Sequence, residues 1–181
     1  GLVHRFPPGS PVRDFAEVPP GRAEEWESLV DQLAGAPAAV REAIERAPDE
    51  DAAPTVGRPT VDIAWQVGHL ARYEREAIRP RVETWPESGV LEFVDWEDGT
   101  EPGPADDEAD LRARTAAFAA EREATVQAVR AAGPSFFERR GRQGAESFSA
   151  YQFLRATIQH DRAHVARIGE RLHRSLLVES E

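Results

Sequence analysis

The sequence predicts an all-α fold, a four-helix bundle in which each helix buries one apolar stripe. Four segments carry apolar residues at helical spacing, and proline or glycine residues end most of them. A long acidic stretch separates the second segment from the third and is typical of a crossover loop. No strand pattern with hairpin chemistry and no internal repeat competes with this interpretation. We expect one bundle domain at residues 22–175, an extended arm at 1–21 and a tail at 176–181.

The first two helices are expected between residues 22 and 84. Prolines are frequent before this segment and block helix formation there, so helix one should begin at about Arg22. We expect it to be kinked or split near Pro37. Helix two should run from Thr60, which suits an N-cap, to Thr84. The pair Trp85-Pro86 then ends it, because a residue before proline disfavours the helical conformation.

The last two helices follow the acidic crossover. Residues 87–110 hold ten acidic residues and no basic one, interleaved with glycine and proline, which favours a solvated loop. Helix three should run from about Asp106 to Ala132, with acidic residues in its first turn. Ser149 followed by Gln152 matches a capping box, so helix four should begin there and end near His173.

The composition excludes several classes of function. The chain of 181 residues has no cysteine, which excludes disulfides, a thiol nucleophile and a thiolate metal site. A net charge of −11 disfavours nucleic acid as a partner. No apolar run approaches the roughly 20 residues needed to cross a membrane. The first residues lack the pattern of a secretory signal, so we expect a cytoplasmic protein.

Three histidines are the candidate metal ligands. His160 and His164 are four residues apart, so one helical face presents both imidazoles about one turn from each other. His69 lies on the corresponding flank of helix two. If the two flanks meet, three imidazoles would leave an open coordination position of the kind that catalytic zinc uses. Spacing alone also allows a surface pair or histidines satisfied within the core.

Two segments carry a family resemblance. The residues WQVGHL at 65–70 and IQHDRAHVARI at 158–168 resemble the two signatures of the DinB/YfiT-like superfamily of metal-dependent bundle proteins. The resemblance covers about residues 24–173 in helix order. It implies that His69, His160 and His164 bind a divalent ion, commonly zinc or nickel.

Three charged residues fall on apolar stripes: Glu74, Arg122 and Asp161. A buried unpaired ion costs several kcal/mol, so we expect Arg122 to bridge Glu74 or Asp161 beneath the metal. Alternatively, Asp161 accepts the second ring proton of a ligand histidine. A rotation of the helices that leaves these charges at the rim, in contact with water, is the remaining alternative.

Other polar residues carry weaker expectations. Tyr73 lies near His69 in projection and is either a proton donor or an aromatic at the rim of the site. His4 and His173 are expected at the surface. Ser147 and Ser149 lack the pattern of a nucleophile elbow and are better explained as residues at a helix start. Whether the acidic loop covers the site as a lid stays open.

The resemblance implies an enzyme, either a metal-dependent hydrolase or a transferase that uses a low-molecular-weight thiol such as mycothiol or bacillithiol. Because the chain has no cysteine, that thiol would come from outside. A related branch isomerises maleylpyruvate and can replace a histidine ligand by glutamate, which this chain does not do. The expected partner is a small-molecule substrate, and a homodimer is left open. The alternatives are a non-catalytic, metal-stabilised stress-response or interaction protein, and a bundle without metal.

Overall fold

Four long helices and a small sheet make up the part of the chain that the computed structural model describes, which is residues 15, 23–45, 59–96 and 111–178. Side chains are not described at 23, 59–62 and 170–178. The helices are α1 (Trp26–Glu45), α2 (Pro59–Tyr73), α3 (Arg79–Thr84), α5 (Leu111–Ala132) and α6 (Ala150–Val178), and the strands are β1 (Val90–Glu92), β2 (Arg140–Gln143) and β3 (Glu146–Ser149).

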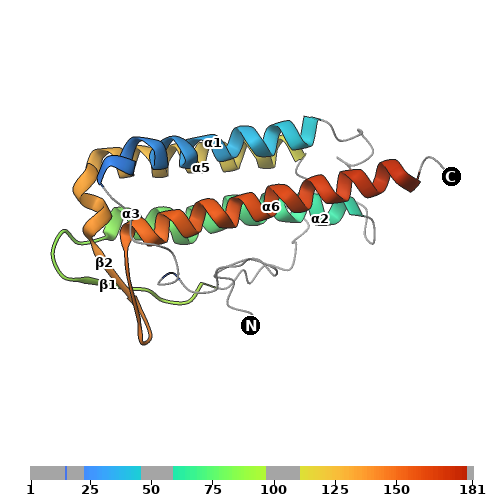
Figure 1. Cartoon of the computed structure of the whole chain (residues 1–181). Helices are drawn as coiled ribbons and strands as arrows, with labels where there is room; N and C mark the ends of the chain where they lie inside the picture. The colour runs from blue at the N-terminus through green and yellow to red at the C-terminus, as the bar shows by residue number, and fades with distance from the viewer. Residues whose placement is uncertain (1–14, 16–22, 46–58, 97–110, 179–181) are drawn as a thin grey trace.

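The helices form two layers, one of α1 and α5 and one of α2 and α6 (Figure 1). Each long helix packs against two others, because α1 and α2 both contact α5 and α6. This arrangement confirms the predicted four-helix bundle. None of the described helices is long and apolar enough to cross a membrane.

Helix α1 continues through Pro37, so of the two predicted alternatives the split is wrong, and the kink stays a prediction. Proline has no N–H, and within a helix its nitrogen leaves the carbonyl four residues earlier without a donor. That carbonyl belongs to Leu33. Its hydrogen bond comes from another helix, as described below. A short 3-10 turn at Ala23–Glu25 precedes the helix, close to the predicted start at Arg22.

Helix two ends at Thr84 as predicted but contains one wide turn. Between α2 and α3 lies a π-helical turn, Glu74–Ile78, in which the N–H of Arg79 donates to the carbonyl of Glu74. The next residue, Pro80, cannot donate, and its ring would clash with a carbonyl four residues back in a regular α-helix. A π-turn is one way to accommodate that ring, and such turns are frequent at functional sites.

The predicted capping box opens α6. The N–H of Ser149 donates to Oε1 of Gln152 at 2.8 Å, and the N–H of Gln152 donates to the hydroxyl of Ser149 at 3.2 Å. The helix continues to Val178, past the predicted end near His173 and into the predicted tail. The predicted start of helix three at Asp106 lies outside the described residues, in which α5 begins at Leu111.

A three-stranded sheet corrects the expectation of no strands. Strand β1 pairs in parallel with β2, and β2 pairs antiparallel with β3 across a turn at Gly144, whose φ is +58°. Strand β1 lies within the stretch that was expected to be a solvated loop. The inward positions of β2 are Gly141 and Gln143, so the strand lacks the alternating apolar residues by which strands are recognised in sequences.

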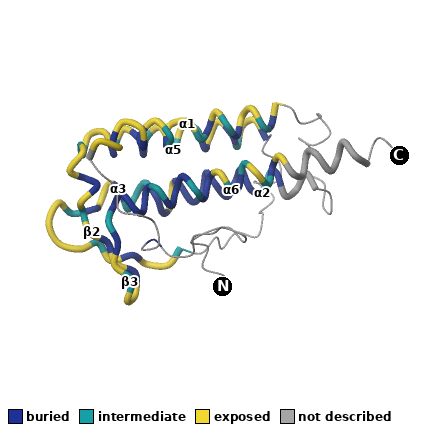
Figure 2. The backbone as a smooth tube through the Cα atoms, viewed as in Figure 1, coloured by how far each residue is buried: buried dark blue, intermediate teal, exposed yellow. Residues whose placement is uncertain are grey.

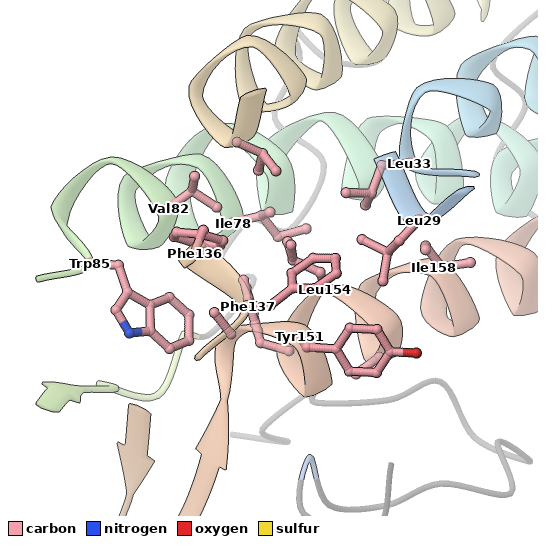
Figure 3. Close-up of a cluster of buried hydrophobic side chains, with 14 of the residues drawn as sticks. Leu29, Leu33, Ile78, Val82, Trp85, Phe136, Phe137, Tyr151, Leu154 and Ile158 are labelled. Carbon is pink, nitrogen blue, oxygen red and sulfur yellow. The ribbon is translucent and has the colours of Figure 1, made fainter. Parts of the chain in front are cut away.

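The sheet packs on the aromatic half of the core. Figure 3 shows Trp85, Phe136 and Leu154 among the buried side chains that join α3, the segment before β2, and α6. Phe15, in the predicted amino-terminal arm, also lies in this cluster and contacts Phe93, Phe148 and Phe153. Figure 2 shows buried positions concentrated along α2 and α6, the two helices that carry the candidate histidines.

Candidate metal centre

The three candidate histidines converge between α2 and α6. The side chains of His69, His160 and His164 are each 2–3% exposed, and one ligand atom from each lies within 4.8 Å of the others. The Nε2 atoms of His160 and His164 are 3.2 Å apart. The helical spacing in α6 therefore places two imidazoles at one point, and the packing of α2 brings the third.

Hydrogen bonds on the outer ring nitrogens orient two of these imidazoles. Nδ1 of His164 lies 3.2 Å from Oε1 of Gln66, and Nδ1 of His160 has a longer contact of 3.5 Å with Oδ1 of Asp161. Both oxygens act as acceptors, so each Nδ1 carries the proton. Each Nε2 then turns a lone pair toward the centre of the cluster.

This donor set fits a metal ion. Two Nε2 lone pairs at 3.2 Å repel each other unless a cation or a proton lies between them. Zinc–nitrogen bonds of about 2.0–2.1 Å at a tetrahedral angle place the two nitrogens about 3.3 Å apart. Among the described residues, no carboxylate oxygen joins the three histidines in a group whose ligand atoms all lie within 4.8 Å of one another. The group therefore resembles an open three-histidine site rather than a closed structural one.

Aromatic rings line the cluster on the side of His69. The ring of Trp65 stacks on His69 with centroids 5.0 Å apart, and the ring of Tyr73 is 6.1 Å from His69 on a nearly parallel plane. Tyr73 is also 5.0 Å from the ring of His160. Trp96, from the segment after β1, lies 5.7 Å from His69 and donates from Nε1 to Glu76. These rings limit the access of water to the imidazoles.

A buried ion network lies beside the cluster. Arg122 donates from Nε and Nη2 to the two carboxylate oxygens of Glu74, each at 2.8 Å, and Nη1 lies 2.7 Å from Oδ2 of Asp161. The predicted bridge is therefore present, and Arg122 pairs with both carboxylates. Nη1 also donates to the Leu33 carbonyl at 3.0 Å. All three charged side chains are at most 3% exposed, so the alternative in which they lie at the rim is wrong.

The network sets the charges of its members. Burial by itself raises the pKa of Asp161, but the charge of Arg122 and the contact with His160 lower it more, so its pKa lies below the usual range. Burial lowers the pKa of Arg122, yet the two carboxylates raise it further. Burial raises the pKa of the Tyr73 hydroxyl, partly opposed by Arg81. Asp161 is thus an ionised carboxylate that contacts Arg122 and His160 together.

The structure also places the residues that were given less weight. Ser149 caps α6, as expected, whereas Ser147 is exposed in strand β3, so the expectation that it lies at a helix start is wrong. His4 and the side chain of His173 lie outside the described residues. Gln66 was not predicted as a partner of His164. Its position three residues before His69, one helical turn away on the same flank, is the signal that points to it.

Comparisons with known proteins identify a family and a similar fold. A family model described as the DinB superfamily matches residues 32–168. The solved structure of YfiT from Bacillus subtilis is similar in fold, with a TM-score of 0.65 and 18% sequence identity. The match covers 84% of this chain and 88% of YfiT, which is described as a probable metal-dependent hydrolase with an unusual four-helix bundle topology. No curated protein matches the sequence.

Proposed function

The chain belongs to the DinB superfamily, and we propose that it is a metal-dependent enzyme that holds one divalent ion, zinc or nickel, on His69, His160 and His164. The observation that carries this proposal is the pair of Nε2 atoms 3.2 Å apart, both turned inward by hydrogen bonds on Nδ1. A cation between them removes the repulsion between the lone pairs. The three rings are buried at the contact of two helices, so their positions are fixed before any ligand arrives.

The absence of a fourth ligand among the described histidines and carboxylates supports an enzyme over a purely structural site. A bound divalent ion supplies a Lewis acid that polarises a carbonyl and raises the fraction of a coordinated water or thiol present as its anion. The chain itself provides the surroundings. Trp65 and Trp96 exclude water on the side of His69, while Gln66 and Asp161 hold the rings of His164 and His160.

We propose hydrolysis as the first reaction class, because the similar protein YfiT is described as a probable metal-dependent hydrolase. Transfer of a low-molecular-weight thiol is the second. It requires a thiol from outside, since the chain has no cysteine. Tyr73 is the proposed proton donor in either case, because its ring lies 5.0 Å from that of His160 and its hydroxyl is held beside Arg81 at 3.5 Å. The cytoplasmic location remains a prediction.

An activity screen with a site variant tests the proposal. Protein loaded with zinc or with nickel is assayed for hydrolysis of ester, amide and lactone panels, and for thiol conjugation with mycothiol, bacillithiol and an electrophilic dye. We expect turnover in one panel, and its loss in His160→Ala with the helical content unchanged. Turnover that survives this substitution would contradict the assigned site. Metal binding and metal-dependent melting without any turnover would support the non-catalytic alternative.

A further inference from the structure

A pocket lies outside the histidine cluster, between α3 and the segment that follows β1. Its volume is about 330 Å³. That size suits a small molecule near the lower end of the usual range. The walls are mostly apolar and come from Ala77, Pro80, Leu91, Phe93, Val94 and Trp96.

Arg81 is the cation in this pocket. Its guanidinium lies 4.3 Å from the centre of the Phe93 ring, donates from Nη2 to the carbonyl of Val94 at 3.0 Å, and contacts the Tyr73 hydroxyl at 3.5 Å. No carboxylate of the described residues pairs with it, although the chain carries a net charge of −11. A guanidinium has five N–H donors, and these contacts leave several of them for a ligand.

The acidic residues that line the pocket have donors of their own. Glu76 accepts from Nε1 of Trp96 at 3.1 Å. Glu92 accepts from Arg142, and Asp95 accepts from Gln143. These carboxylates are therefore engaged away from Arg81. The half-buried guanidinium is left facing a largely apolar space, in which a charge-assisted contact is stronger than at an open surface.

The pocket adjoins the histidine cluster through two aromatic rings. Trp96 lines the pocket and lies 5.7 Å from His69, and its ring is 5.0 Å from that of Tyr73. Tyr73 contacts Arg81 on one side and lies 5.0 Å from the His160 ring on the other. A ligand on Arg81 would thus lie one aromatic layer away from the imidazoles.

We propose that this pocket binds a small carboxylic acid, with the carboxylate on Arg81 and an apolar body against Leu91, Phe93 and Trp96. A planar guanidinium pairs with a carboxylate through two parallel hydrogen bonds. This inference rests on the proposed function: the pocket would hold the carboxylate of the enzyme's substrate, which makes the substrate a small carboxylic acid. Binding itself does not need the metal, so the two proposals fail separately.

The inference is tested by measuring how metal-free protein binds three acids: benzoate, phenylacetate and hexanoate. Ligand-detected NMR and tryptophan fluorescence report the binding. Phenylacetamide is the uncharged match to phenylacetate, and inorganic phosphate is the second anion. We expect at least one acid to bind, and phenylacetate to bind at least about tenfold more tightly than its amide. Arg81→Gln should abolish that preference, Arg81→Lys should weaken but keep it, and the exposed control Arg75→Gln should leave it unchanged.

Three results would overturn the inference: no binding of any of the acids, equal binding of phenylacetate and phenylacetamide, or a preference that survives in folded Arg81→Gln. Phosphate binding that depends on Arg81 without carboxylate binding would also overturn the assigned ligand class. The same titrations in His160→Ala separate the proposals. Acid binding that persists there supports the pocket even if the metal centre fails.

Discussion

Arg122 donates from Nη1 to the carbonyl of Leu33 at 3.0 Å. In a regular helix this carbonyl would accept from the N–H of residue 37, but Pro37 has no N–H. The proline in α1 therefore creates an acceptor that a side chain of α5 satisfies. The same guanidinium pairs with Glu74 from the π-turn and with Asp161 from α6. Arg122, a residue of α5, is thus bonded to α1, to the π-turn that follows α2 and to α6, next to the imidazoles.

Replacing Arg122 by methionine tests this connection. The substitution leaves two buried carboxylates and one carbonyl without their donor, so we expect a loss of about 3–5 kcal/mol in the free energy of unfolding. Urea denaturation measures it. The control is Arg130→Met, whose pairs with Glu27 and Asp31 are exposed and should contribute less than about 1 kcal/mol. Equal midpoints for the two variants would show that the network does not stabilise the fold.

Gln66 is expected to tune the affinity for metal without being a ligand. Its Oε1 accepts from Nδ1 of His164 and fixes the ring orientation, and loss of such a partner typically lowers metal affinity about 10–100-fold. Competition with a chromophoric chelator measures the metal affinity of Gln66→Ala. Gln127→Ala, which removes an exposed contact with Glu123, serves as the control and should bind like the parent protein. An unchanged affinity in Gln66→Ala would remove this role.

Tyr73→Phe separates a proton donor from a packing aromatic. If the hydroxyl donates a proton, kcat should fall about 100-fold or more while the metal content stays the same. Tyr151→Phe is the matched control, since Tyr151 is also buried but packs against Phe137 away from the histidines. We expect its kcat to be unchanged. A Tyr73→Phe variant with the kcat of the parent would leave the ring with a packing role alone.

Gly141 is expected to be required for stability, because it lies where the sheet packs against the core and has no room for a side chain. A Cβ at this position would lie 2.6 Å from Cε2 of Phe148 and 2.8 Å from Cζ2 of Trp85. Gly141→Ala should therefore destabilise the protein by about 1–3 kcal/mol in thermal or urea unfolding. Gly169→Ala, in α6 with no atom within 4 Å, should be neutral or stabilise by up to about 1 kcal/mol. Destabilisation of similar size in both variants would contradict the steric account.

The helical part of the fold was predictable because its signals are local. Apolar spacing, the capping box at Ser149 and the Trp85-Pro86 stop each act within a few residues of the chain. The hairpin was missed because the inward positions of β2 hold Gly141 and Gln143, which give no apolar pattern. Gly141 is buried against Trp85 and Phe148, a contact that the sequence does not show. Strand β1 was missed because three residues in an acidic stretch carry too weak a pattern.

The candidate site was predictable to the extent that charge and spacing define it. An arginine on the apolar stripe of α5 requires a carboxylate, which pointed to Arg122 and its partners. The hydrogen bond to Leu33 was not foreseen, because the sequence shows that Pro37 leaves an acceptor but not which side chain reaches it. The position of Trp96 over His69 likewise depends on how the segment after β1 packs.

The most direct test of the metal centre is the metal content of the protein, purified without a histidine tag and loaded with zinc or nickel. Inductively coupled plasma mass spectrometry should find one divalent ion per chain, and His160→Ala or His164→Ala should lose most of it while Gln159→Ala keeps it. A folded parent protein that binds neither metal, or a histidine variant that binds as much as the parent, would contradict the account.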